Sequence, residues 1–308
     1  MEKHISVLKD EAISNLNIKA DGIYIDCTLG FGGHSSEILR KLTTGQLYAF
    51  DKDINAIEYS KSFLASINDR FTLFNESFDN LKQRCESLDI KPDGVLFDLG
   101  VSSVEIDDPK RGFSYMHDGP LDMRMDQNSS LTAEMVVNEY KKEDLVKIFR
   151  EYGDERHAQK IVNEIINIRE NERINRTLRL VEIIDRCYPY REKRNSHPAK
   201  KVFQALRIEV NNELGEFEKT LYDALDLLNV GGRICVITFH SLEDRICKNI
   251  FKKYTDIDPV VKGMPNIPDD MLPDYKLITK RPIIPTEKEI KLNSRSKSAK
   301  LRVIERVK

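Results

Sequence analysis

The sequence of 308 residues has no apolar run close to the roughly 20 residues that a membrane-spanning helix needs. Its first residues, Met-Glu-Lys-His, are polar and do not resemble a secretory signal peptide. None of its five cysteines forms a C-x-x-C pair, which excludes the usual signs of a disulfide framework or a zinc site. These absences predict a protein of the reducing cytoplasm. No metal site is expected, because four histidines lack the spacing of metal ligands: His4, His117, His157 and His197.

The net charge of −2 is also small, but it is unevenly distributed. Residues 276–308 contain 11 Lys or Arg and 3 Glu, a local charge of +8, so the rest of the chain carries −10. Such a basic segment is either a solvated surface or a contact for a polyanion. The length predicts one large domain with a smaller one attached.

The densest group of glycines follows the first strongly apolar segment. That segment ends at Asp26, and a helical pattern begins near His34. Three glycines lie between them: Gly30, Gly32 and Gly33. A strand, a glycine loop and a helix in this order are typical of the nucleotide-binding start of a βαβ unit, because glycine allows the backbone to turn sharply and a ligand to approach it.

The spacing of the glycines distinguishes between two kinds of cofactor. A dinucleotide fingerprint, G-x-G-x-x-G, would require glycine where Ser35 stands, which disfavours NAD. From Asp26 the sequence reads D-x-T-x-G-x-G-G, close to the D-x-G-x-G-x-G loop of S-adenosylmethionine-dependent methyltransferases, with Thr28 at the first glycine. A turn without a ligand is the simpler interpretation of the loop alone. Asp51 ends the next predicted strand, however, and a carboxylate there can bind both hydroxyls of a ribose.

Short apolar segments alternate with helical patterns in the first hundred residues, which predicts a doubly wound α/β sheet. The predicted strands are residues 23–25, 46–50, 71–74 and 94–99, and the predicted helices are residues 54–67 and 75–88. Ligands of such sheets bind beyond the carboxyl ends of the strands. We therefore expect Asp26, Asp51 and Asp98 to surround one crevice.

The pattern changes after Gly100. Residues 101–127 are rich in turn-forming and charged residues and are too long for an ordinary connection, which indicates a functional loop. Helical patterns without a strand then predict an inserted helical domain at 125–195, with the α/β domain formed by 1–124 and 196–308. A strong strand at 233–239 ends beside His240 and Asp244, and a last strand at 300–307 is expected to close the sheet.

Several blocks of the chain resemble one family. The most distinctive are Gly-Pro-Leu-Asp-Met-Arg-Met-Asp at 119–126 and Phe-His-Ser-Leu-Glu-Asp-Arg at 239–245. Together with the glycine loop and the blocks at 98–103, 111–114 and 203–208, they are similar to bacterial methyltransferases that make N4-methylcytosine in the decoding region of small-subunit ribosomal RNA. The resemblance covers nearly the whole chain.

The resemblance implies a class I S-adenosylmethionine-dependent methyltransferase, Rossmann-like, with an inserted all-helical domain. The enzyme would transfer a methyl group from S-adenosylmethionine to the N4 amine of a cytidine in small-subunit ribosomal RNA, within the assembled or assembling subunit. No membrane partner is expected, and a homodimer is left open. The expected cofactor contacts are Gly30, Gly32, Gly33, His34, Asp51, Phe78, Asp98 and Glu105. Glu105 stands where the family usually has glutamine, and an ionised carboxylate can accept a hydrogen bond but cannot donate one.

The candidate catalytic residues follow the carboxyl ends of two predicted strands. They are Asp98, Ser102, His240 and Asp244. Ser102 could instead be a turn residue, and His240 with Asp244 could cap the next helix. Two other classes of function are weighed against the methyltransferase: an NAD-dependent oxidoreductase, which lacks its third glycine, and a non-catalytic RNA-binding protein that uses the basic segment. The latter would not need Asp51 and Asp98 in register at the ends of their strands.

Overall fold

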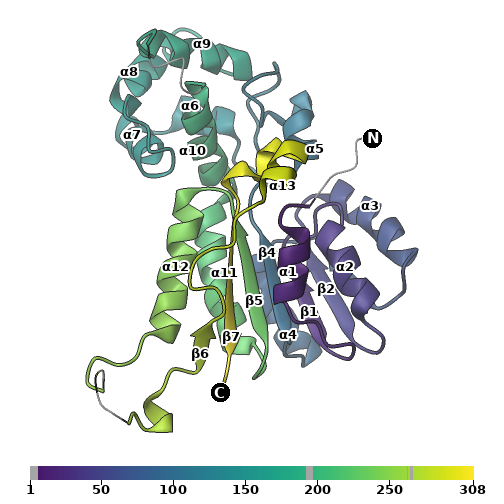
Figure 1. Cartoon of the computed structure of the whole chain (residues 1–308). Helices are drawn as coiled ribbons and strands as arrows, with labels where there is room; N and C mark the ends of the chain where they lie inside the picture. Colours follow the sequence, from purple (N-terminus) through teal and green to yellow (C-terminus); the bar gives the residue numbers. More distant parts are fainter. Residues whose placement is uncertain (1–5, 192–196, 262, 264–265) are drawn as a thin grey trace. The chain divides into compact units, whose positions relative to one another are not determined.

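A computed structural model describes residues 6–191, 197–261, 263 and 266–308. They form two compact units, residues 6–100 with 215–308 and residues 101–214, each of which is described by itself (Figure 1). None of the described helices has the length and apolar character to cross a membrane.

The first unit contains a seven-stranded sheet in the order β3-β2-β1-β4-β5-β7-β6. The strands are β1 Ile23–Asp26, β2 Gln46–Phe50, β3 Phe71–Phe74, β4 Gly94–Asp98, β5 Arg233–Thr238, β6 Tyr275–Leu277 and β7 Lys300–Arg306. The first five are parallel, and β7 runs antiparallel to β5 and β6. Because β1 pairs with both β2 and β4, the carboxyl ends of these three strands lie side by side. The doubly wound α/β prediction is confirmed.

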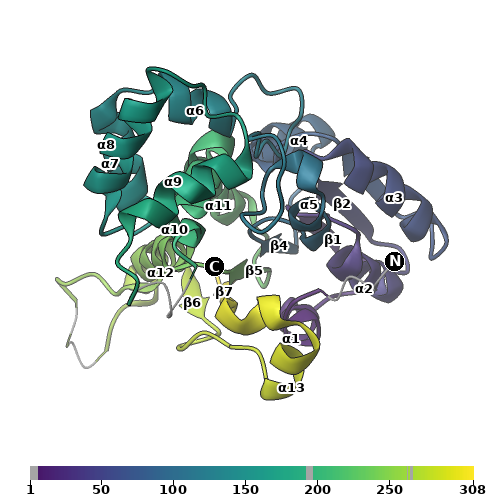
Figure 2. The same cartoon turned by 90° about the horizontal axis from the view of Figure 1, so that it is seen from above.

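Helices cover both faces of this sheet, as Figure 2 shows from above. The helices of one face are α1 Lys9–Asn15, α2 Gly33–Lys41 and α3 Ile54–Ala65, whose apolar side chains share one core with β2, β5 and β7. Those of the other face are α4 Leu81–Leu88, α11 Glu213–Leu227 and α12 Ser241–Thr255, which share a core with β4. The central strand β4 contributes Leu96 to the first core and Phe97 to the second, and both side chains are fully buried. Burial on both faces explains why this strand reads as a continuous apolar run.

The last strand does not end the sheet. β7 lies between β5 and β6, and the short strand β6 was not predicted. The sequence around β6 is rich in proline, which lacks a backbone N–H and is unusual in strands. A strand of only three residues is also too short to show a periodic pattern.

The second unit is helical. Its helices are α5 Ser103–Asp107, α6 Ala133–Glu139, α7 Lys142–Glu151, α8 Ala158–Arg169, α9 Thr177–Cys187 and α10 Ala199–Asn211. The chain does not continue from α10 into α11 as one helix, because Asn212, with a φ of 48°, ends α10 before α11 begins.

The predicted boundaries after residues 124 and 195 both lie inside the second unit, which spans Val101 to Leu214. Phe113, Leu121 and Met123 from the long loop are buried in the same core as Val202 of α10. The Asn211 amide also accepts from the Met125 N–H at 2.8 Å and donates to the Met123 carbonyl at 2.8 Å. The loop of residues 101–127 therefore belongs to the helical unit. The contacts that attach it to α10 join residues far apart in the chain, so no local sequence pattern reveals them.

The glycine loop has its own geometric requirements. Gly30 and Gly32 have φ values of 49° and 76°, in the left-handed region that disfavours side chains. Gly33 begins α2 with an ordinary φ, but a Cβ there would lie 1.8 Å from Oγ of Ser6. The glycine at position 33 is therefore required by packing against the segment before α1.

Replacing Gly33 by alanine should destabilise the first unit by about 1–3 kcal/mol, the usual cost of overpacking. The double variant Gly33→Ala/Ser6→Ala, which removes the clashing oxygen, should recover part of this loss in thermal melting. Equal melting temperatures for the single and double variants would show that Ser6 is not the cause.

Candidate active site at the carboxyl edge of the sheet

Asp26 ends β1 and is 1% exposed. Its Oδ2 accepts the Ser35 hydroxyl at 2.6 Å, and its Oδ1 accepts the Thr28 N–H at 3.1 Å. Burial raises the pKa of Asp26 despite these two hydrogen bonds. Thr28 in turn accepts the Asp98 N–H through its hydroxyl at 2.7 Å, so the ends of β1 and β4 are connected by side chains.

Asp98 ends β4 and has one oxygen that the protein does not satisfy. Its Oδ1 is buried and has no hydrogen-bond partner among the described residues. Its Oδ2 lies 3.5 Å from Nδ1 of His34, whose Nε2 is 3.2 Å from the Val7 carbonyl. Burial, with Asp26 and Glu243 nearby, raises the pKa of Asp98 well above its ordinary value. A buried acceptor without a donor is costly, and a ligand with an N–H or O–H group would satisfy it.

Asp51 follows β2 and contacts the glycine loop. Its Oδ2 accepts the Gly30 N–H and its Oδ1 the Asp53 N–H, each at 2.8 Å. Burial raises the pKa of Asp51 to about 6, against the opposing effect of these two N–H groups. Each carboxylate oxygen has a further lone pair, so the residue retains capacity to accept hydrogen bonds from hydroxyl groups.

Phe78 begins a short 3-10 helix, Phe78–Asn80, in the connection between β3 and α4. Its ring is partly exposed and packs edge-on against the buried ring of Phe97 on β4, with the ring centroids 5.9 Å apart. This contact holds part of the Phe78 ring against the core. The exposed part is suited to contact a flat apolar group.

The end of β5 is organised by Glu243, whose side chain is 1% exposed. Its Oε2 accepts the N–H groups of Phe239 at 2.7 Å and His240 at 3.2 Å, while Nδ1 of His240 accepts the Glu243 N–H at 3.4 Å. Nε2 of His240 approaches Oε1 of Glu243 to 2.9 Å as a close contact without hydrogen-bond geometry. These reciprocal contacts cap α12, which was the alternative role considered for His240.

Asp244 is held by two cations of β7. Its oxygens accept from Arg302 at 2.7 Å and Lys300 at 2.9 Å. Burial raises the pKa of Asp244, but the hydrogen bonds from Arg302 and Lys300 outweigh that effect and leave it below its ordinary value. An acid so strongly paired is a weak proton acceptor, so these contacts favour a structural role over the predicted catalytic one.

Ser102 and Glu105 lie in the second unit and contact each other. The Ser102 hydroxyl accepts the Glu105 N–H at 3.3 Å, and Oε2 of Glu105 accepts the Ser102 N–H at 3.0 Å, a capping box at the start of α5. Oε1 of Glu105 accepts from Arg111 at 3.3 Å. Arg111 also donates to the Arg124 and Met125 carbonyls, at 2.9 and 3.1 Å. Ser102 and Glu105 therefore both have local structural contacts, and a local role had been considered for Ser102 but not for Glu105.

The structure brings together most of the predicted site residues of the first unit: the glycine loop, His34, Asp51 and Asp98. Two buried residues of this edge were not among the predicted site residues: Ser35, which binds Asp26, and Glu243, which caps α12. Ser35 was visible only as the missing glycine of a dinucleotide fingerprint. Glu243 stands three residues after His240, the spacing of a capping box, and that signal could have identified it.

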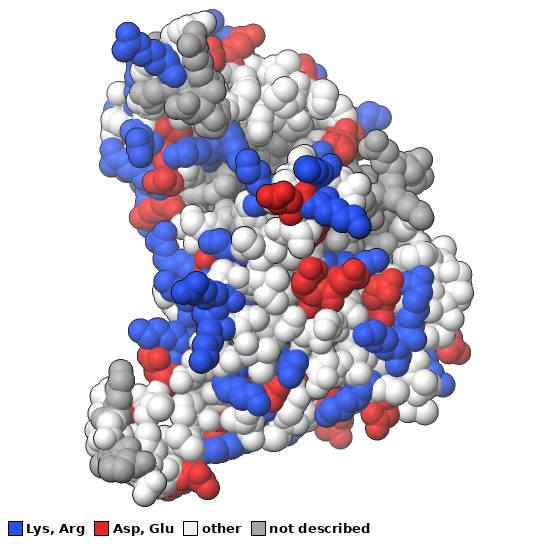
Figure 3. Space-filling view, in the orientation of Figure 1, with Lys and Arg blue, Asp and Glu red and all other residues white. Residues whose placement is uncertain are grey.

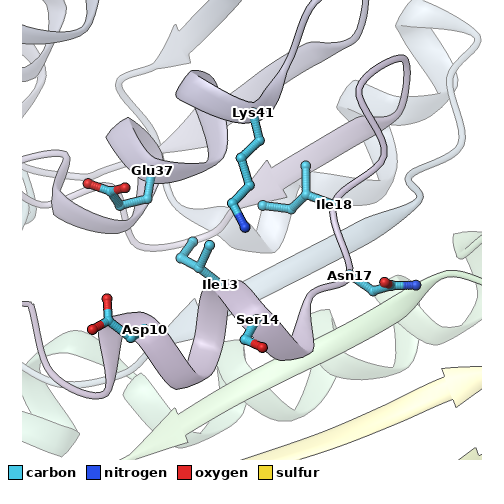
Figure 4. Close-up of a pocket in the computed structure, with 7 residues that line it drawn as sticks. All are labelled: Asp10, Ile13, Ser14, Asn17, Ile18, Glu37 and Lys41. Carbon is cyan, nitrogen blue, oxygen red and sulfur yellow. The ribbon is translucent and has the colours of Figure 1, made fainter.

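A surface pocket lies elsewhere in the first unit, between α1 and α2 (Figure 4). Its lining residues are Asp10, Ile13, Ser14, Asn17, Ile18, Glu37 and Lys41. None of them is a predicted site residue, and the pocket lacks an unsatisfied buried group such as Oδ1 of Asp98. The carboxyl edge of the sheet is therefore the better candidate.

Several known proteins are similar to this chain. The ribosomal RNA small subunit methyltransferase H of Exiguobacterium sibiricum is 50% identical over 310 residues, covering 100% of this chain and 99% of its own length. The protein of the same name from Lactiplantibacillus plantarum is 51% identical over 311 residues, covering 99% of this chain and 98% of its own. Among solved structures, an rRNA methylase from Streptococcus thermophilus has 11% identity and a TM-score of 0.44, covering 97% of this chain and 94% of that one.

The profile of one protein family matches residues 1–307, nearly the whole chain. The match confirms the prediction of an S-adenosylmethionine-dependent methyltransferase, which rested on the glycine loop, Asp51 and the distinctive sequence blocks. This chain belongs to the MraW methylase family.

Proposed function

We propose that this methyltransferase acts on small-subunit ribosomal RNA and methylates the N4 amine of a cytidine in the decoding region. The names of relatives at 50% and 51% identity support the ribosomal RNA substrate. The single structural observation that carries the proposal is the buried, unsatisfied Oδ1 of Asp98 beside the glycine loop. It is an acceptor suited to an amine N–H.

S-adenosylmethionine supplies an electrophilic methyl group on a positively charged sulfur. The residues present fit this cofactor: Gly30 leaves the backbone of the loop open to a ligand, because a Cβ there would meet no atom within 4 Å, and Asp51 has lone pairs for ribose hydroxyls. Phe78 offers an apolar ring for the adenine. His34 lies in the first turn of α2 beside Asp98, at a helix end where N–H groups are available.

The exocyclic amine of cytosine is a poor nucleophile because its lone pair is delocalised into the ring. Asp98 can accept one of its N–H groups, which localises the lone pair on nitrogen, and can take the proton when that nitrogen becomes cationic. Its pKa is raised in the ligand-free protein, so it carries a proton more readily than an ordinary aspartate. The positive charge of S-adenosylmethionine bound nearby would favour the ionised form of Asp98, which accepts the N–H of the amine. The target base must also leave its stack to reach the site.

The RNA itself would be held through phosphates by exposed cations. The exposed basic residues of the carboxyl-terminal segment are Lys276, Lys280, Arg281, Lys288, Lys291, Arg295, Lys297 and Lys308. Lys300 and Arg302, by contrast, pair with Asp244. Figure 3 shows further Lys and Arg side chains over α12, which the sequence analysis did not consider; its exposed cations include Lys248, Lys252 and Lys253. We expect the substrate to be the assembled or assembling subunit in the cytoplasm, with a homodimer left open.

The direct test is mass spectrometry of ribosomal RNA nucleosides from cells with and without this gene. We expect N4-methylated cytidine to fall in the deletion and to return with the intact gene. Unchanged N4-methylation would reject the proposed product. Thermal shifts in the purified protein separate the alternatives, because an oxidoreductase would be stabilised by NADH and a methyltransferase by S-adenosylhomocysteine.

Affinity for S-adenosylhomocysteine should fall as the pH decreases from 7 to 5. The pKa of Asp51 is about 6, and only its ionised form can accept both ribose hydroxyls. Its protonated fraction rises below pH 6, so binding should weaken about ten-fold at pH 5 relative to the plateau. Calorimetry of Asp51→Asn, which does not titrate, should show weaker binding that varies little over this range. A pH dependence that persists in this variant would point to another group, such as Asp98.

Asp98→Asn should reduce single-turnover methylation by at least about 10²-fold, the lower end of what positioned acid–base groups contribute. The substitution keeps the shape but removes the carboxylate that takes the proton. If saturating cofactor restored the full rate, Asp98 would be a cofactor-binding residue only, and His240 would become the next candidate for the acceptor.

Neutralising Lys280 and Arg281 together should weaken RNA binding and lower its salt dependence. Each lost phosphate contact removes about 0.7–0.9 from the slope of log affinity against log salt concentration. The matched control is Lys61→Gln/Lys82→Gln, which removes two exposed cations of α3 and α4. The same slope in both double variants would mean that the carboxyl-terminal segment does not contact the RNA.

A further inference from the structure

A single carboxylate on α11 connects two loops at the carboxyl edge of the sheet. Oε2 of Glu216 lies 2.6 Å from Nζ of Lys52 and accepts the Ser77 hydroxyl at 2.8 Å. The side chains of Lys52 and Glu216 are only 17% and 16% exposed. The pair is therefore less screened by solvent than a surface ion pair.

The two partners of Glu216 adjoin the residues assigned to the nucleoside part of the cofactor. Lys52 directly follows Asp51, the ribose acceptor, in the loop after β2. Ser77 directly precedes Phe78, and its hydroxyl also accepts the Asp79 N–H at 3.2 Å, which caps the 3-10 helix that Phe78 begins. A displacement of Glu216 would thus change the position of both loops.

Neighbouring residues of α11 hold the same turn. Nζ of Lys219 donates to the Asp79 carbonyl at 2.5 Å, and the Thr220 hydroxyl lies 3.5 Å from the Phe78 carbonyl. The ring of Phe217 packs edge-on against Phe97, the ring that supports Phe78. Of these residues, Glu216 has hydrogen-bond or ion-pair contacts with both loops.

The separation of Asp51 from Phe78 matters because a nucleoside has few internal rotations. Its ribose hydroxyls and its base can be separated by only a narrow range of distances, so the acceptor and the aromatic ring must be placed to match that range. Flexibility between the two loops would have to be lost on binding, at a cost in affinity. The Glu216 carboxylate binds both loops before the ligand does, which reduces the cost in affinity of ordering them.

We propose that Glu216 is a positioning residue that fixes Asp51 relative to Phe78 and thereby sets the affinity for the nucleoside part of S-adenosylmethionine. The inference rests on the proposed cofactor roles of Asp51 and Phe78. Glu216 itself acts through Lys52 and Ser77.

The test compares Glu216→Ala with Glu218→Ala, a control that removes an exposed carboxylate from the same helix two residues away. We expect calorimetry to give about ten-fold weaker binding of S-adenosylhomocysteine for Glu216→Ala, the effect of losing a charge-assisted contact, and no change for Glu218→Ala. The single-turnover rate at saturating S-adenosylmethionine should stay close to that of the unmodified protein. Glu216→Gln retains an acceptor for Ser77 and should lie between the two.

A second variant shows whether the effect passes through the loop that carries Phe78. Ser77→Ala should weaken binding in the same direction, and the double variant Glu216→Ala/Ser77→Ala should weaken it by less than the sum of the two single effects, because both single variants lose the same contact. If Glu216→Ala does not fold, Ser77→Ala and Glu216→Gln give the same comparison.

The outcomes separate this inference from the function on which it rests. If the unmodified protein failed to bind S-adenosylhomocysteine, the cofactor roles of Asp51 and Phe78 would be wrong. If it bound normally and Glu216→Ala behaved as Glu218→Ala does, or lost rate at saturation with its affinity intact, the positioning role would be overturned.

Discussion

Four carboxylates gather at the carboxyl ends of the parallel strands, and the cost of burying negative charge there determines how the surrounding loops are built. Asp26, Asp51, Asp98 and Glu243 would each lose solvation without compensation. Three of them are compensated by N–H or hydroxyl donors from the loops: Asp26 by Ser35, Asp51 by Gly30 and Glu243 by Phe239. Asp98 keeps one buried oxygen that accepts no hydrogen bond from any residue the structure describes. The unequal compensation is what makes Asp98 different from its neighbours.

The same contacts explain how rigid loops arise in a segment rich in glycine. Gly30 and Gly32 allow left-handed turns, but their conformational freedom must be removed for a ligand to bind tightly. Asp51 holds the Gly30 N–H, and the Ser60 hydroxyl on α3 donates to the Gly30 carbonyl at 2.8 Å. Gly33 is fixed differently, by its close approach to Ser6. Glycine is thus needed for a left-handed backbone conformation at two positions of this loop and for close packing at a third.

Ser35 shows how one residue can exclude one cofactor and support another. A dinucleotide fingerprint needs glycine at this position, and the serine was first evidence against NAD. In the structure its hydroxyl is fully buried and binds Asp26, which Thr28 connects to the end of β4. The departure from one motif is therefore a structural requirement of this site.

The sequence by itself determined the strands of the parallel sheet, the glycine loop, and the placement of Asp26, Asp51 and Asp98 at the ends of their strands. These are local features: apolar runs, turn residues and the alternation of strand and helix patterns. Only the tertiary structure decided where the second unit begins, that β6 extends the sheet beyond β7, and that Asp244 is paired with Lys300 and Arg302. Each of these depends on contacts between residues far apart in the chain, such as Met123 with Asn211 and Asp244 with Arg302. A local pattern specifies which side chains need a partner, but the packing of distant segments decides which partner they find.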